Sequence, residues 1–108
     1  KTKCSRDIIV KALQAEGVSI SPKYQNLHLL PMFQKKIAYG KKGFPWKSKI
    51  YSGKVNYSKG ICPIAEKLND EKLLQLTLCD YEYSDKDIVK LIRAFNKVWS
   101  KLSTLRDA

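Results

Sequence analysis

The sequence of 108 residues contains no long hydrophobic run. No stretch approaches the roughly 18 consecutive apolar residues that a membrane-spanning helix requires, and no short apolar segment with a small-residue cleavage site marks a signal peptide. The chain is 44% hydrophobic, which at this length allows one domain with a modest core. We therefore expect a single soluble domain over residues 1–108, located in the cytoplasm and without a membrane partner.

Cysteine and histidine are scarce. The three cysteines, Cys4, Cys62 and Cys79, are odd in number and far apart, without the paired spacing that binds zinc or exchanges disulfides. Idle thiols in a reducing compartment are the favoured interpretation. His28 is the single histidine and cannot make a histidine-rich metal site. We expect no bound metal.

Acidic residues and arginine are also few. The chain has 21 basic residues against 10 acidic ones, a formal net charge of +11, and only Arg6, Arg93 and Arg106 are arginine. A cationic surface attracts nucleic acid, anionic membranes or phosphorylated small molecules, but a lysine-rich composition is an equally simple explanation. Interfaces that read base sequence favour arginine, and the lysines here are spread along the whole chain. Nucleic-acid binding is therefore the less favoured prediction.

The strongest structural signal lies between Ser84 and Leu102. Apolar residues recur there at spacings of three and four, which places them on one face of a helix: Ile88, Leu91, Ile92, Phe95, Val98, Trp99 and Leu102. Ser84 is a typical N-cap, and Asp87 three positions later makes a weak capping box. The pattern predicts a long amphipathic helix whose apolar face is buried.

The remaining elements are shorter. Ser5 caps a helix that ends at Glu16 before Gly17, and Val18 to Ser21 alternates as a strand does. Further along we predict, in order, a short helix over 32–39, a loop over 40–60, a helix over 62–68 started by Pro63 and closed at 69–70, a strand over 74–78, and a frayed tail over 103–108. This order predicts a two-layer α/β (α+β) domain, in which helices cover a short sheet and the last helix packs across it.

The loop over 40–60 mixes aromatic residues with lysines. Such a mixture is typical of surfaces that stack single-stranded bases and neutralise their phosphates. It is equally typical of a long loop that uses aromatic side chains to fix itself to its own domain. We favour the second interpretation, because the spacing of Phe44, Trp46, Tyr51 and Tyr57 is irregular.

Two stretches carry motifs in a distinctive order. The first is a helix that begins with Arg6-Asp7 and ends Leu13-Gln14-Ala15-Glu16-Gly17-Val18, followed by Tyr24, Leu27-His28 and Pro31. The second is Cys62-Pro63-Ile64-Ala65-Glu66-Lys67-Leu68, followed by a strand around Leu76 and by Ser84-Asp85-Lys86-Asp87-Ile88. Together they resemble the C-terminal portion of the DegT/DnrJ/StrS family of pyridoxal-phosphate-dependent sugar aminotransferases. The resemblance covers nearly the whole chain.

The resemblance implies the small C-terminal domain of a fold-type I aminotransferase. The parent enzyme would move an amino group from glutamate or glutamine to a keto-sugar, usually nucleotide-linked, in amino-sugar or surface-polysaccharide biosynthesis. Pyridoxal phosphate would be held by a large domain of the same polypeptide, and the parent would be a homodimer. No lysine of this chain lies in a context that fits the Schiff-base lysine, so we expect no catalysis from these residues alone.

By the same resemblance, the loop around Tyr24 and His28 would face the sugar, and Lys23 could meet a phosphate or carboxylate there. The motif residues Cys62, Pro63 and Glu66 would be structural, with Glu66 in a local salt bridge or capping a backbone group. The missing initiating methionine suggests a piece of a longer protein, which would expose apolar surface and self-associate. The alternative is a stand-alone basic module that binds nucleic acid.

Overall fold

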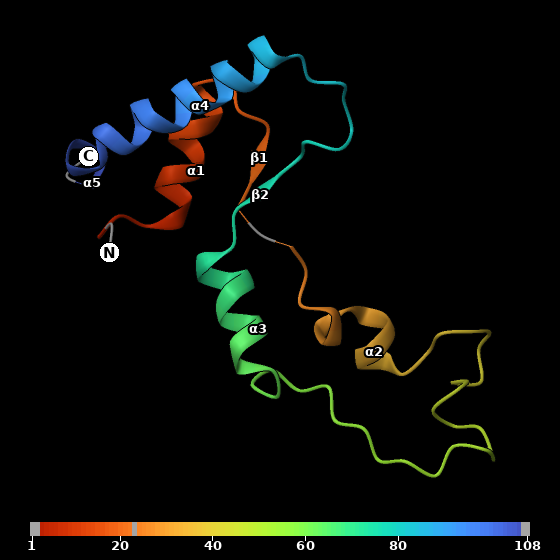
Figure 1. Ribbon diagram of the computed structural model, residues 1–108. Helices are drawn as coiled ribbons and strands as arrows, with labels where there is room; N and C mark the ends of the chain where they lie inside the picture. Colours follow the sequence, from red (N-terminus) through yellow and green to blue (C-terminus); the bar gives the residue numbers. More distant parts are fainter. Residues whose placement is uncertain (1–2, 23, 107–108) are drawn as a thin grey trace. The chain divides into compact units, whose positions relative to one another are not determined.

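The computed structural model describes residues 3–22 and 24–106. The chain forms two compact units, which we call the core unit (Lys1–Tyr24 and Asp70–Ala108) and the loop unit (Gln25–Asn69). The described residues contain no helix that is long and apolar enough to cross a membrane. Figure 1 shows the elements in chain order.

Helix α1 of the core unit spans Arg6–Ala15, close to the predicted range. The Ser5 hydroxyl accepts a hydrogen bond from the amide of Ile8 at 3.4 Å, and Gly17 follows the helix with a φ of 83°. Only glycine adopts this left-handed conformation without strain, so both ends are set by the local sequence. The helix buries three apolar residues of the core: Ile9, Val10 and Leu13.

The sheet is smaller than predicted. Strand β1 (Ile20–Ser21) pairs antiparallel with β2 (Gln75–Leu76), with Ile20 opposite Leu76. The predicted strands over 18–21 and 74–78 are therefore each paired over two residues. The mixture of helices with a short antiparallel sheet confirms the α+β class.

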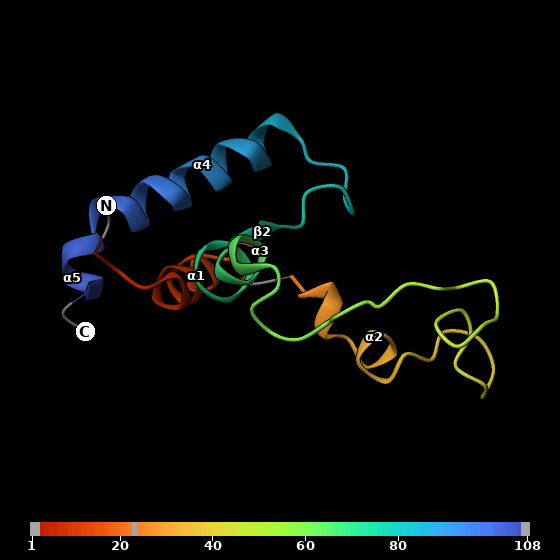
Figure 2. The ribbon, with the colours of Figure 1, turned by 90° about the horizontal axis from the view of Figure 1, so that it is seen from below.

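Helix α4 (Asp85–Ser100) confirms the long helix and its cap. The Ser84 hydroxyl accepts from the Asp87 amide at 3.4 Å, and the Ser84 amide donates to the Asp87 carboxylate at 3.2 Å, which together form the capping box. The main packing partner of α4 is α1, so the prediction that it lies across the sheet is wrong in this respect (Figures 1 and 2). Two short strands offer too little surface to cover a helix of four turns.

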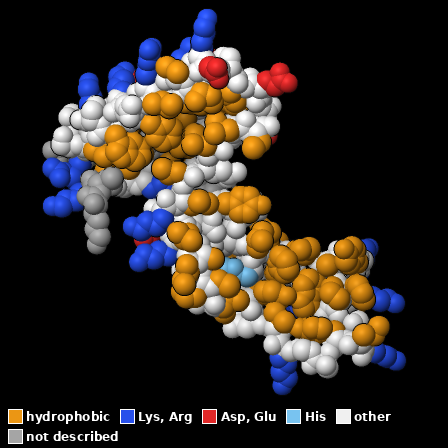
Figure 3. Space-filling model, in the orientation of Figure 1, with side chains coloured by type: hydrophobic (Ala, Val, Ile, Leu, Met, Phe, Trp, Pro, Cys, Tyr) orange, Lys and Arg blue, Asp and Glu red, His pale blue; other side chains and the backbone are white. Residues whose placement is uncertain are grey.

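The apolar face of α4 is only partly buried, which corrects the sequence-based prediction. Ala94 and Val98 enter the core beside α1, whereas Ile88, Ile92 and Trp99 remain exposed. In Figure 3 apolar side chains form a broad surface over this part of the core unit. The periodicity predicted which side of the helix is apolar, but not how much of that side this chain covers.

The predicted frayed tail is also wrong for the described residues. Helix α5 spans Leu102–Arg106 after a change of direction at Lys101. Leu102 and Leu105 pack against the buried cluster, and this burial offsets the cost of ordering the chain end.

The loop unit contains only short helices. A 3-10 turn, η1 (Leu27–Leu29), precedes α2 (Pro31–Lys35), which ends earlier than predicted because Lys36 adopts a left-handed conformation. Helix α3 (Pro63–Lys67) starts at the predicted proline. Helical geometry continues from it into a π-helical turn, η2 (Leu68–Lys72), so residues 69–70 do not close it as expected. Between α2 and α3 the chain is irregular, as predicted (Figure 2).

Candidate functional site

A buried carboxylate organises the loop unit. Glu66, on α3, is only 6% exposed. The amide of Gly60 donates to its Oε1 at 2.7 Å and to its Oε2 at 2.9 Å, and the amide of Cys62 donates to Oε1 at 3.4 Å. The chain between Gly60 and α3 therefore wraps around the carboxylate and satisfies it with backbone donors.

His28 is the side-chain partner of this carboxylate. Its Nε2 lies 2.8 Å from Oε1 of Glu66, and the two side chains are 10% and 8% exposed. An ionised carboxylate only accepts hydrogen bonds, so the proton of this contact belongs to Nε2. In its neutral form His28 is then the tautomer with a lone pair on Nδ1.

The surroundings of Glu66 keep it ionised. Burial acts to raise the pKa of this carboxyl, but the hydrogen bonds from the Gly60 amide, the His28 side chain and the Cys62 amide outweigh burial. Together with the charge of His28 they hold the pKa below its ordinary value of 4.5. At neutral pH the Glu66 carboxylate is thus a fixed anion that orients the imidazole of His28.

Gln34 connects the histidine turn to the long loop. Its amide nitrogen donates to the carbonyl of His28 at 2.7 Å and to the carbonyl of Tyr57 at 2.6 Å. The Tyr57 hydroxyl in turn accepts from Trp46 Nε1 at 2.9 Å, and the rings of Tyr57 and Trp46 pack against Phe33 with centroid distances of 5.2 and 6.1 Å. These contacts confirm, for Trp46 and Tyr57, that loop aromatics fix the loop to its own unit.

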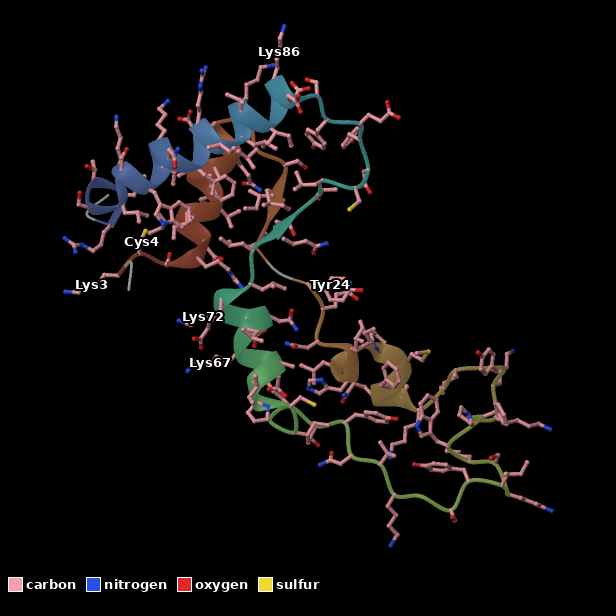
Figure 4. All side chains as sticks on the ribbon, viewed as in Figure 1. Lys3, Cys4, Tyr24, Lys67, Lys72 and Lys86 are labelled. Atoms are coloured by element: carbon pink, nitrogen blue, oxygen red, sulfur yellow. The ribbon has the colours of Figure 1, made fainter. Side chains whose placement is uncertain are left out.

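The three predicted site residues have different outcomes. His28 lies in the loop unit and is held by Glu66. Tyr24 belongs to the core unit, where it is 57% exposed, and is labelled in Figure 4. Lys23 lies outside the described residues.

The described residues do not fit a pyridoxal phosphate site by themselves. A Schiff-base lysine must be held beside the cofactor, away from bulk water. In ranges 3–22 and 24–106 every lysine is exposed except Lys36, whose ammonium donates to the carbonyl of Val55 at 3.1 Å. Nor do three or more histidine, cysteine or acidic side chains of these ranges gather as metal ligands would. None of the three cysteines forms a disulfide among the described residues.

Sequence reasoning missed the partner of His28. It assigned Glu66 a local salt bridge or a backbone cap, and the backbone contacts to Gly60 and Cys62 confirm the second role. The hydrogen bond to His28 instead joins residues 38 positions apart, and no periodicity connects them. The one available signal was chemical, because the loop unit holds a single histidine and a single acidic residue.

The oriented imidazole can accept or donate a proton, or hydrogen-bond an oxygen of a bound molecule, in a defined direction. It can equally serve as a fixed link between η1 and α3. Comparison of the chain with protein-family models, curated proteins and solved structures gives no match.

Proposed function

We propose that this chain is the small C-terminal domain of a pyridoxal-phosphate-dependent sugar aminotransferase of the DegT/DnrJ/StrS family. The parent enzyme transfers an amino group from glutamate or glutamine to a nucleotide-linked keto-sugar, in amino-sugar or surface-polysaccharide biosynthesis. The observation that supports this best is the hydrogen bond between His28 and Glu66. It joins the Leu-His stretch to the Cys-Pro-Ile-Ala-Glu stretch, the two separate motifs that carry the resemblance.

In this proposal His28 is the residue of the chain that faces the sugar. Glu66 holds its imidazole at Nε2, so Nδ1 is the atom available to a substrate oxygen or to a proton. The exposed Tyr24 and the neighbouring Lys23 are the other proposed sugar contacts. Glu66 itself is a positioning residue, because its oxygens are occupied by backbone amides and by His28.

The exposed apolar face of the core unit supports the proposal that a partner domain is missing from this chain. A groove of about 280 Å³ runs between β2 and α4, and its lining is almost entirely apolar: Leu76, Leu78, Ile88, Leu91, Ile92, Phe95 and Asn96. Contiguous apolar surface of this kind marks an interface more often than free surface. We propose that the large domain of the same polypeptide covers it and brings the cofactor, which supplies the amino-group chemistry when bound. Homodimerisation of the parent and a cytoplasmic location are parts of the same proposal.

The nucleic-acid alternative has less support. It relied on loop aromatics that would stack on bases. Trp46, Tyr57 and Phe33 instead pack against one another, which leaves those rings few open faces.

The first test is the reading frame upstream of Lys1 in the source of the sequence. The proposal predicts a few hundred further residues, including a lysine after a strand and an acidic partner for the cofactor ring. A start codon directly before Lys1 would contradict it.

The second test uses the full-length protein loaded with pyridoxal phosphate, assayed with glutamate and nucleotide-linked keto-sugars. We expect His28→Asn to lower kcat/KM for the sugar by about 10² or more, since a positioned proton donor or acceptor contributes about that much. The cofactor absorbance should not change. Cys79→Ser, at an exposed position of the core unit, is the matched control. Equal activity of the two variants would remove His28 from the site.

A further inference from the structure

The positive charge of the chain is concentrated in one unit. The loop unit holds no arginine and one acidic residue, Glu66, against nine lysines: Lys35, Lys36, Lys41, Lys42, Lys47, Lys49, Lys54, Lys59 and Lys67. Its formal charge is +8 of the +11 of the whole chain. The other nine acidic residues belong to the core unit. A generally lysine-rich composition would not separate the acidic residues in this way.

The surface of the loop unit carries a larger excess of positive charge than the amino-acid composition of the unit suggests. Its one carboxylate is buried and hydrogen-bonded to His28 and to backbone amides, so it is not part of the exposed surface. Eight of the nine lysines are exposed, and Lys67 is labelled on α3 in Figure 4. Anions that approach this unit therefore meet positive side chains without a competing carboxylate.

Exposed apolar side chains lie among these lysines. Between residues 39 and 50, Tyr39 and Phe44 are exposed, and Ile50 is 94% exposed. Lys41, Lys42, Lys47 and Lys49 alternate with them in the sequence. Figure 3 shows lysines projecting around the edge of an apolar surface on this unit. An apolar patch with a lysine rim is the composition of surfaces that lie in the interface of a bilayer.

We propose that the loop unit docks on anionic membrane surfaces through residues 39–50. The lysines would contact lipid headgroups, while Ile50, Tyr39 and Phe44 enter the boundary between headgroups and acyl chains. This proposal is independent of the aminotransferase assignment, and it revises the sequence-based expectation of no membrane partner. It concerns attachment to a surface and not a spanning segment.

The same charge would attract nucleic acid, but three observations favour a bilayer. The loop unit lacks arginine, which carries bidentate recognition of phosphates and bases. Its most exposed apolar side chain, Ile50, is aliphatic and cannot stack on a base. In the larger aromatic cluster, the rings of Phe33, Trp46 and Tyr57 pack against one another.

Flotation of the 108-residue chain with vesicles tests the proposal, since aggregates do not float. We expect the chain to float with vesicles of phosphatidylcholine mixed with phosphatidylglycerol, not with phosphatidylcholine alone, and to be released by salt. The triple variant Lys41→Glu, Lys42→Glu, Lys49→Glu should bind on the order of 100-fold more weakly, at about fivefold for each lysine near the surface.

The control triple, Lys11→Glu, Lys72→Glu, Lys86→Glu, changes the net charge equally in the core unit, where Lys72 and Lys86 are labelled in Figure 4. It should keep most of the binding. Ile50→Ser should weaken binding several-fold more than Ile64→Ser, which changes another exposed isoleucine of the loop unit outside residues 39–50. Equal loss in both triples, no flotation at low salt, or tight binding to a single-stranded oligonucleotide without binding to vesicles would each overturn the proposal.

Discussion

The two units of this chain are stabilised by different means. The core unit buries a cluster of seven apolar side chains: Ile9, Val10, Leu13, Val18, Ile20, Ala94 and Val98. The loop unit, all of whose residues are described, buries no hydrophobic side chain completely, and its buried side chain is the charged Glu66. It is held by hydrogen bonds of Glu66 and Gln34 and by three aromatic rings that pack in edge-to-face and tilted contacts.

This difference has consequences for stability. Apolar burial is non-directional and largely independent of pH, whereas a buried carboxylate stabilises only while it is ionised and fully hydrogen-bonded. We therefore expect the loop unit to open locally at lower cost than the core unit, and to respond to acid first. The five predictions below test that contrast.

Leu13→Ala should have the largest effect. Leu13 is 0% exposed at the centre of the core unit, and truncation of such a leucine costs about 2 to 5 kcal/mol. Urea denaturation followed by circular dichroism measures the loss. The control is Leu78→Ala, at a half-exposed position, which should cost less than about 1 kcal/mol. Similar losses would show that the apolar cluster is not the stabilising core.

Glu66→Gln should open the loop unit and spare the core unit. The amide keeps the shape of the carboxylate, but it loses the charge and one of the acceptor oxygens that bind Gly60 and His28. Hydrogen exchange should be faster at amides of residues 25–69 and unchanged in α1 and α4. The exposed Glu82→Gln is the control. Uniform acceleration over both units would contradict the contrast.

Acid should act on the loop unit first. Because the folded pKa of Glu66 lies below its ordinary 4.5, its contribution to stability is complete above about 4.5 and is lost as pH falls through the folded value. Each unit has one tryptophan, so Trp99→Phe leaves Trp46 as the reporter of the loop unit. Its emission should change below pH 4.5, and this change should vanish in a Glu66→Gln background.

The reporter of the core unit gives the comparison for this acid titration. In Trp46→Phe the signal comes from Trp99 on α4, whose unit depends on an apolar cluster. The Ser84 hydroxyl and Lys90 hold the pKa of Asp87 below its ordinary value of 3.8, so the contribution of this cap to stability is complete down to about pH 3.8. Coincident transitions of the two reporters would contradict the account.

Ser84→Ala should have a moderate effect confined to the core unit. The variant removes the N-cap of α4 and costs about 1 kcal/mol. Thermal unfolding measures this loss of stability. The control is Ser103→Ala in α5, because the Ser103 hydroxyl caps no helix among the described residues. A change in hydrogen exchange within residues 25–69 would show that the units are not separable in this way.

Ile92→Ser should leave stability nearly unchanged, because the side chain is 54% exposed. It should instead reduce self-association of the chain, since Ile92 lines the apolar groove that lacks a cover. Analytical ultracentrifugation of the unmodified 108-residue chain and of the variant measures the self-association. If the unmodified chain is strictly monomeric, the groove no longer supports the proposal of a missing partner domain.

Local signals in the sequence predicted the starts of α1, α3 and α4 and the end of α1. Ser5, Gly17, Pro63 and Ser84 each act within one turn, through a hydrogen bond or a backbone angle that the residue itself determines. The loop over 40–60 was also predicted from a local signal. The irregular spacing of its aromatic residues leaves no continuous apolar face for a helix or strand to bury.

Features that depend on distant partners were not predicted. The pairing of His28 with Glu66 crosses 38 residues, and Leu105, in the predicted frayed tail, is helical where it packs against the buried cluster. The periodicity of α4 identified its apolar side but could not tell that Ile88 and Ile92 would stay exposed. In each case the missing information was the identity of the neighbour.

The hydrogen bond between His28 and Glu66 is the point on which both the loop unit and the proposed function depend, and NMR of the imidazole nitrogens measures it directly. We predict that neutral His28 carries its proton on Nε2, and that Glu66→Gln changes the Nε2 resonance. A proton on Nδ1 in neutral His28, or an Nε2 resonance that does not respond to Glu66→Gln, would contradict the account.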